Sequence, residues 1–190
     1  MVKKITMLKA LEPFLAKPAE KLHLAGIAKE IKEPHPTVRL WLNDLEKRGI
    51  LKKKHQGRLT LYYLNTESPD VIGYLVIAEK GKLISKSEKW PLLAELVSFM
   101  HHGMDEDSKI LIFGSAAESF DSANDLDILI VGKGDSSMLG AFTKRLGKEA
   151  HVISVKKLSD VSKALKAEII KKHLLVQGSE NFARWMLWQR

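Results

Sequence analysis

Two short apolar segments with polar residues at one end constrain the fold of this chain most strongly. Residues 109–113 predict a buried strand that is followed at once by a glycine and a serine. After a gap of nine residues, residues 125–131 predict a second buried strand, which begins Asp-Leu-Asp. Because side chains alternate along a strand, Asp125 and Asp127 share one face, and apolar residues occupy the other. The two segments therefore predict a sheet with a polar, chemically active edge.

The two carboxylates on this strand are expensive to bury as anions, and a divalent cation would remove that cost. Mg²⁺ prefers such oxygen ligands and completes its shell with water and phosphate oxygens, and Mn²⁺ is an alternative. Gly114 allows backbone N–H groups to approach a phosphate closely, and the Ser115 hydroxyl can donate to it. We therefore expect Asp125 and Asp127 to bind metal and Gly114 and Ser115 to bind nucleotide. The alternative is a pair of strand-end carboxylates that accept hydrogen bonds from backbone N–H groups.

Phe113-Gly114-Ser115 and Asp125-Leu126-Asp127-Ile128, with the gap between them, resemble the nucleotidyltransferase signature of the DNA polymerase β superfamily. The size of the chain is similar to that of its minimal nucleotidyltransferase branch, and the superfamily core would lie within residues 88–178. The resemblance implies a mixed four-stranded sheet flanked by helices. Its strands would lie near residues 109–113, 126–132, 149–155 and 173–177. It also implies Mg²⁺-dependent transfer of a nucleoside monophosphate from a nucleoside triphosphate to an acceptor hydroxyl.

The chain departs from this family at two places. The family carries a third carboxylate on a later strand, where our alignment places His151. Glu149 lies two residues earlier on the same face and is the candidate replacement, so we take it as a catalytic residue. Minimal members also carry Gly-Ser-x-Ala-Arg-Gly, whereas Glu118 and Ser119 stand here at the Arg and Gly positions. A degenerate domain that only binds nucleotide, or binds nothing, stays open.

The positive charge of the chain is concentrated in its first third. The formal net charge is +8, and residues 1–66 hold 14 Lys and Arg against six Asp and Glu. Residues 67–190 hold 17 of each and are neutral. This asymmetry predicts two modules, the first of which faces a polyanion. The alternative is a solvated surface that is rich in lysine.

Apolar spacing in the first third predicts three helices and a hairpin. The helices are expected at residues 3–16, at residues 20–32, and from about Pro36 to Arg48 with Gly49 as C-terminal cap. Residues 50–64 predict two strands around a Gln-Gly turn.

This order of elements resembles a winged helix-turn-helix domain of the archaeal and bacterial regulator type, over residues 3–65. The stretches that carry the resemblance are Leu24–Ile31, Pro36–Val38 and Leu42–Leu51. The resemblance implies that the third helix enters the major groove of double-stranded DNA while the hairpin contacts phosphate. The alternative is a winged helix used for protein contacts, or one that packs against its own second domain. The candidate DNA-binding residues are Thr37, Arg39, Asn43, Lys52, Lys53, Lys54 and Arg58.

The remaining segments predict an α+β protein in three parts: a winged helix at residues 1–66, a connecting helix at 67–87 and a nucleotidyltransferase domain at 88–190. We expect the connecting helix to break at Gly81 and Ser85–Ser87, and further helices at residues 89–102, 159–172 and 180–190. The chain has no cysteine, which excludes disulfides and thiolate metal sites. It has neither an apolar run of about 20 residues nor an N-terminal secretory signal, so we expect a cytoplasmic protein without membrane contact.

Three functions are compatible with these patterns. The first is a Mg²⁺-dependent nucleotidyltransferase joined to a DNA-binding domain. The second is a transcriptional regulator whose second domain senses nucleotide, or forms a homodimer, without turnover. The third, implied by the family, is an antitoxin that modifies a partner protein. Asp125 and Asp127 favour the first, whereas Glu118 and the missing third acid favour the second.

Overall fold

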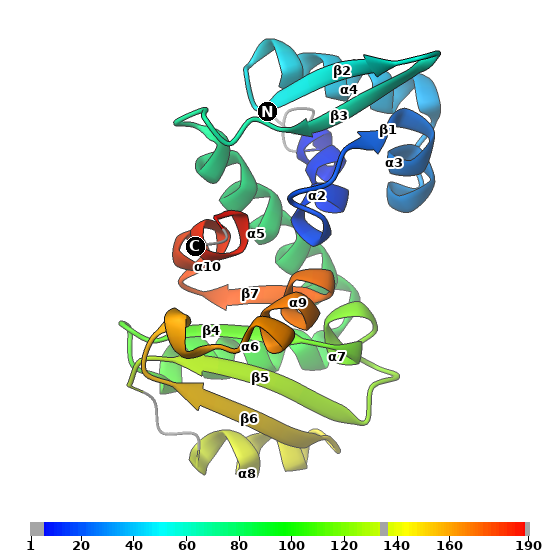
Figure 1. The fold of residues 1–190 in the computed structure, drawn as a ribbon. Helices are drawn as coiled ribbons and strands as arrows, with labels where there is room; N and C mark the ends of the chain where they lie inside the picture. Colours follow the sequence, from blue (N-terminus) through cyan, green and yellow to red (C-terminus); the bar gives the residue numbers. More distant parts are fainter. Residues whose placement is uncertain (1–5, 134–136, 189–190) are drawn as a thin grey trace. The chain divides into compact units, whose positions relative to one another are not determined.

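The computed structural model describes residues 6–133 and 137–188 and shows a mixed α+β architecture with two small sheets (Figure 1). The chain divides into two compact units, which are residues 1–81 with 186–190 and residues 82–185. The division lies inside helix α5 (Val71–Lys89), whereas the sequence predicts boundaries at 66/67 and 87/88. None of the helices within the described residues is long and apolar enough to cross a membrane.

The first unit combines short helices with a three-stranded antiparallel sheet of order β1-β3-β2. Its apolar side chains form a core in which Leu11, Phe14, Val38, Leu42 and Leu45 are fully buried. Its elements are η1 (Leu8–Leu11), α2 (Glu12–Ala16), β1 (Leu22–His23), α3 (Leu24–Ile31), α4 (His35–Lys47), β2 (Leu51–Gln56), β3 (Leu59–Leu64) and the first part of α5.

Two of the helices expected in this unit differ from the structure, whereas the end of the third helix and the hairpin match it. Residues 3–5 of the helix expected at 3–16 lie outside the described residues, and from Leu8 onward it is a 3₁₀ segment followed by α2, with a proline in the first turn of α2. The helix expected at 20–32 begins only at Leu24, because Leu22 and His23 pair with β3. His23 also caps the helix, since its Nδ1 atom accepts a hydrogen bond from the Gly26 N–H at 3.0 Å. The helix end at Gly49, with φ of +71°, and the hairpin turn are confirmed.

The second unit is built on a four-stranded mixed sheet of order β6-β5-β4-β7. β4 pairs antiparallel with β5 and β7, whereas β5 and β6 are parallel. The strands expected at 109–113, 149–155 and 173–177 are confirmed. The strand expected at 126–132 lies one residue earlier, at 125–131. The elements are α6 (Pro91–Gly103), β4 (Lys109–Phe113), α7 (Ser115–Glu118), β5 (Asp125–Val131), α8 (Ser137–Arg145), β6 (Glu149–Val155), η2 (Leu158–Asp160), α9 (Lys163–Lys171), β7 (His173–Gln177) and α10 (Ser179–Leu187).

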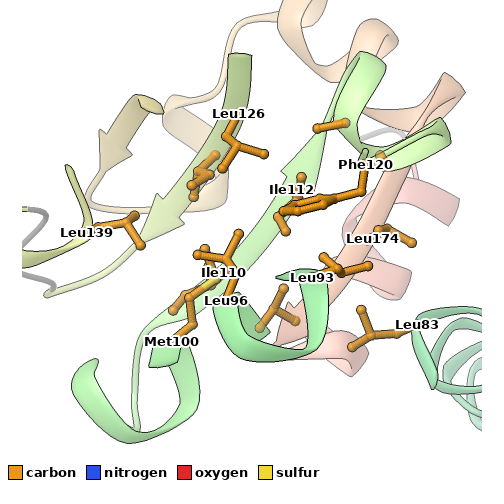
Figure 2. Packing of buried hydrophobic residues seen from close by; sticks show 14 of the residues in the cluster. Leu83, Leu93, Leu96, Met100, Ile110, Ile112, Phe120, Leu126, Leu139 and Leu174 are labelled. Carbon is orange, nitrogen blue, oxygen red and sulfur yellow. The ribbon is translucent and has the colours of Figure 1, made fainter. Parts of the chain in front are cut away.

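One face of this sheet carries the main core of the second unit. Figure 2 shows Leu93, Leu96 and Met100 of α6 against Ile110 and Ile112 of β4, and all five are fully buried. In Figure 1, α6 lies behind the sheet and α9 lies in front of it. The core thus fixes the position of the strands and leaves their polar ends at the rim.

Helix α5 does not break where the sequence predicts. It runs without interruption through Gly81 and through residues 85–87. A glycine inside a helix costs only about 1 kcal/mol relative to alanine, and the buried Ala78 and Leu83 hold the helix on either side. The helix expected at 159–172 is also divided, because Ser162 caps α9 by accepting a hydrogen bond from the Leu165 N–H.

Candidate functional sites

The carboxylates of β5 lie beside the turn that follows β4. In the antiparallel register Phe113 pairs with Asp127, so the chain leaves β4 at Gly114 next to the start of β5. Gly114 has φ of +72°, and a Cβ atom at this position would lie 2.6 Å from the Asp127 Oδ2 atom. Only glycine permits both this backbone conformation and this close approach. The turn and the carboxylate are therefore fitted to each other.

The alternation predicted for β5 is confirmed. Leu126 and Ile128 are fully buried in the core, Asp125 is exposed, and the Asp127 side chain is 34% exposed. The Asp127 Oδ1 atom lies 3.6 Å from the His151 Nδ1 atom. Within the described residues Asp125 has no hydrogen-bond or ion-pair partner, and neither carboxylate accepts a hydrogen bond from a backbone N–H. Both carboxylates thus keep most of their lone pairs available.

Strand β6 brings two more polar side chains to the same face of the sheet. Its parallel register places Glu149 opposite Asp125 and His151 opposite Asp127. The Glu149 side chain is 78% exposed, and its Oε1 atom lies 4.0 Å from the His151 Nε2 atom. The residue beside Asp127, where the family carries its third acid, is therefore a histidine. The predicted substitute Glu149 stands one pair further toward the strand end.

The turn residues show which polar groups are already engaged. The Gly114 N–H donates a hydrogen bond to the Lys172 carbonyl oxygen at 3.2 Å, so a phosphate contact by this N–H requires that bond to break. Ser115 is exposed, and its hydroxyl has no hydrogen bond within the described residues. Of the two predicted nucleotide-binding residues, Ser115 has the free donor.

Glu118 is less unfavourable for an anionic ligand than its charge suggests. Its Oε2 atom lies 2.5 Å from the Lys172 Nζ atom, and its carbonyl oxygen accepts a hydrogen bond from the Lys86 side chain at 2.9 Å. The hydrogen bond and the charge of Lys172 lower the pKa of the Glu118 carboxyl, with a smaller contribution from Lys86. The negative charge at the position where the family carries arginine is thus balanced by nearby lysines.

The arrangement around Asp125 and Asp127 fits a cation that takes part of its shell from elsewhere. Across residues 6–133 and 137–188 no group of three or more Asp, Glu, His or Cys side chains is gathered to hold a metal ion. Mg²⁺ commonly uses only one or two protein carboxylates and completes its shell with water and substrate phosphates. The exposed Asp125 and the half-buried Asp127, neither of which is paired with a lysine within the described residues, supply that donor set.

A second candidate site lies in the first unit, between α4 and the β2–β3 hairpin. It is a groove of about 530 Å³. Arg39 and Asn43 line it from α4, Lys53 lines it from β2, and Arg58 lines it from the hairpin turn. None of the described residues that line the groove is acidic. Four of the seven predicted DNA-binding residues therefore gather around one basic groove.

The other three predicted residues lie elsewhere in this unit. Thr37 is half-buried on α4 and does not line the groove. Because side chains alternate along β2, Lys52 and Lys54 lie on the face opposite Lys53. Lys52 is bound to Glu67 at 2.5 Å, and this hydrogen bond raises the pKa of the lysine.

Groove residues that were not predicted from the sequence include His23, His35 and Tyr62. The Tyr62 hydroxyl lies 3.4 Å from the Asn43 Oδ1 atom. His55, which the sequence places with the cations around the hairpin, also lines the groove. Alternation along β2 and β3 could have found Tyr62, since it shares a face with Lys53 in the hairpin register. His23 carries no such signal, because its place depends on the pairing of β1 with β3.

Comparisons with known proteins add little to these sites. No protein-family model matches the chain, and no curated protein matches it. Among solved structures, human N-acetylserotonin methyltransferase in complex with SAM is similar at 15% sequence identity, with a TM-score of 0.29. The match covers 64% of this chain and 34% of that enzyme. A TM-score of this size does not establish a shared fold, so nothing is transferred from that enzyme to this chain.

Proposed function

We propose that the chain is a Mg²⁺-dependent nucleotidyltransferase whose first unit is a DNA-binding winged helix. The observation that carries the proposal is the β4–β5 register, which sets the Gly114-Ser115 turn beside Asp125 and Asp127. The reaction would transfer a nucleoside monophosphate from a nucleoside triphosphate to an acceptor hydroxyl, with pyrophosphate as leaving group. The mixed sheet of the second unit agrees with the topology that the resemblance to the DNA polymerase β superfamily implies.

The residues that follow β4 and those at the start of β5 would each bind part of the metal–triphosphate complex. Asp125 and Asp127 would hold the Mg²⁺ ion, which neutralises negative charge that develops on the phosphates. Ser115 would donate its free hydroxyl to a phosphate oxygen. Gly114 would keep the turn close to Asp127, because any side chain at this position would collide with the carboxylate.

The alternative function is a DNA-binding transcriptional regulator whose second unit senses nucleotide or dimerises without turnover. The observation that favours it is His151, which stands opposite Asp127 where the family carries a third acid. Glu149 is largely exposed and lies opposite Asp125 instead. A site with two carboxylates can bind a metal–nucleotide complex and still fail to activate an acceptor hydroxyl.

The groove of the first unit supports double-stranded DNA as a partner in either case. Three cationic side chains, Arg39, Lys53 and Arg58, line it, and cations of this kind displace condensed counterions from DNA. Asn43 and Arg39 lie one helical turn apart on α4, and such side chains form bidentate pairs with adenine and guanine in the major groove.

Calorimetric titration with ATP, CTP, GTP and UTP in the presence of Mg²⁺ tests the nucleotide site. We expect at least one of the four to bind wild type and none to bind the folded double variant Asp125→Asn/Asp127→Asn. A control variant, Asp105→Asn/Asp107→Asn, removes two charges from an exposed loop of the same unit and should bind as wild type does. Equal binding by all three proteins would refute the assignment of this site. Radiolabel transfer from the bound nucleotide then separates enzyme from sensor.

Fluorescence anisotropy with a random-sequence duplex tests the groove. Arg39→Ala/Arg58→Ala should weaken binding and reduce the dependence on salt concentration, because two of the cations that line the groove are lost. Lys156→Ala/Lys171→Ala removes the same charge from exposed positions of the second unit and should have little effect. Equal losses in both double variants would show that net charge, rather than the groove, binds DNA.

A further inference from the structure

The rim of the second sheet carries opposite charges on the two sides of the turn that follows β4. The strand order β6-β5-β4-β7 places β5 on one side of Gly114 and Ser115 and β7 on the other. The carboxylates of Asp125 and Asp127 lie on the β5 side. Lys172, the residue before β7, lies on the other side, where its carbonyl oxygen accepts the hydrogen bond from the Gly114 N–H at 3.2 Å. The turn is thus flanked by two anions and by a cation.

Glu118 holds the ammonium group of Lys172 near the Ser115 hydroxyl. Residues three apart on a helix are neighbours on its surface, so Ser115 and Glu118 share one side of α7. The Lys172 Nζ atom lies 2.5 Å from the Glu118 Oε2 atom, and the two side chains are 51% and 64% exposed. The lysine therefore lies on the side of α7 that carries the free hydroxyl donor, and solvent reaches it.

Lys86 of α5 adds a second cation to this side of the turn. Its Nζ atom donates a hydrogen bond to the Glu118 carbonyl oxygen at 2.9 Å and lies 4.8 Å from the centre of the Trp90 ring. Two lysine charges thus stand beside the single carboxylate of Glu118. This side of the turn is positive as a whole, whereas the β5 side is negative.

We propose that Lys172 binds the terminal phosphate of the nucleotide, so that the site selects nucleoside triphosphates over monophosphates. The inference rests on the proposed nucleotide site and names the group that recognises the length of its phosphate chain. A triphosphate carries more negative charge than one divalent ion neutralises, and the lysine supplies a further cation next to Ser115. Glu118 is a positioning residue, because it holds Lys172 at the turn until a phosphate takes its place.

The exchange of Glu118 for a phosphate is favourable for two physical reasons. An exposed ion pair contributes little to stability, so its loss costs little. A phosphate offers several charged oxygen acceptors, and its hydrogen bonds with a lysine ammonium are among the stronger ones in proteins. Lys86 remains beside Glu118 and balances the carboxylate that Lys172 leaves.

The test is calorimetric titration in Mg²⁺ with ATP, ADP and AMP, and with the corresponding forms of cytidine, guanosine and uridine. Lys172→Gln should weaken binding of the triphosphate by about tenfold and change binding of the monophosphate little. Glu118→Gln removes the competing anion and should strengthen binding of the triphosphate alone. Lys171→Gln, an exposed lysine at the end of α9, is the matched control and should bind all forms as wild type does.

The outcomes separate this inference from the proposed nucleotide site. Equal effects of Lys172→Gln on tri- and monophosphate, or no effect on either, overturn the inference. If Asp125→Asn/Asp127→Asn still abolishes binding in that case, the nucleotide site stands. Failure of wild type to bind any of the nucleotides overturns both.

Phosphorus NMR of the bound triphosphate locates the contact. The γ-phosphate resonance should differ between saturated wild type and saturated Lys172→Gln, and the α-phosphate resonance should not. A γ-phosphate resonance that is the same in both proteins overturns the inference, because Lys172 then acts only on the fold.

Discussion

Replacement of Gly114 by alanine tests whether the turn and the carboxylate are fitted to each other. Gly114 has φ of +72° and ψ of −147°, a region that is almost restricted to glycine, and a non-glycine residue there costs about 1–3 kcal/mol. The new Cβ atom would also lie 2.6 Å from the Asp127 Oδ2 atom. The Asp127 side chain must then rotate, which adds about 1 kcal/mol. We expect Gly114→Ala to lower the free energy of unfolding by about 2–4 kcal/mol.

The chain offers a control with the same positive φ. Gly147 has the same φ of +72°, but a Cβ atom there would meet nothing within 4 Å. Gly147→Ala should therefore cost only the left-handed backbone, about 1–2 kcal/mol. Urea denaturation of both variants, and of each one combined with Asp127→Ala, forms two double-mutant cycles.

The two cycles have different expected outcomes. Removal of the Asp127 carboxylate should recover about 1 kcal/mol of the loss in Gly114→Ala and none of the loss in Gly147→Ala. Equal losses in the two glycine variants, with no recovery in either cycle, would refute the close approach between the turn and β5. The nucleotide site would then lose the geometric observation on which it rests.

Three further predictions concern the hairpin, the core and a surface ion pair. Lys53→Ala should weaken DNA binding and reduce the slope of log affinity against log salt concentration by about one. Lys54→Ala, on the opposite face of β2, should have a smaller effect on both quantities. Equal effects of the two variants in anisotropy titrations would contradict the groove assignment. Phe120→Ala should lower the free energy of unfolding by about 3–5 kcal/mol in urea denaturation, because Phe120 is fully buried, and a loss below about 1 kcal/mol would contradict its place in the core. Lys172→Ala should raise the pKa of Glu118 toward its ordinary value, as ¹³C NMR titration of the carboxyl can show. Because the pKa of Glu118 is lower in the folded state, the exposed pair stabilises the fold above the unfolded pKa of Glu118, and this stabilisation is lost as pH falls through the folded pKa. The free energies of unfolding of wild type and Lys172→Ala should therefore converge in acid.

The elements that the sequence predicts well are those whose signal is local. The apolar strand at residues 109–113 and the alternation of residues 125–131 depend only on neighbouring residues, and both are confirmed. Gly49 ends α4 in the left-handed conformation that a helix C-terminus favours. In each case the residue type and its immediate neighbours determine the backbone.

The elements that the sequence predicts poorly depend on distant partners. Leu22 and His23 fit a helical pattern, yet they form β1 because β3, some forty residues later, offers an edge to pair with. Gly81 looks like a helix breaker, but α5 continues through it because buried residues on both sides keep the helix in place. Burial and pairing of this kind outweigh a local preference of about 1 kcal/mol.

The position of His151 also depends on residues that are distant in the sequence. Its spacing from Glu149 indicates that both lie on one face of a strand, but which of the two stands beside Asp127 depends on the register of β5 with β6. These strands are parallel and are joined through α8, so no tight turn sets their register. A shift by two residues would set Glu149 opposite Asp127 and line this edge of the sheet with carboxylates. The observed register sets the imidazole of His151 there instead, so the pairing of these two strands decides which side chain stands beside Asp127.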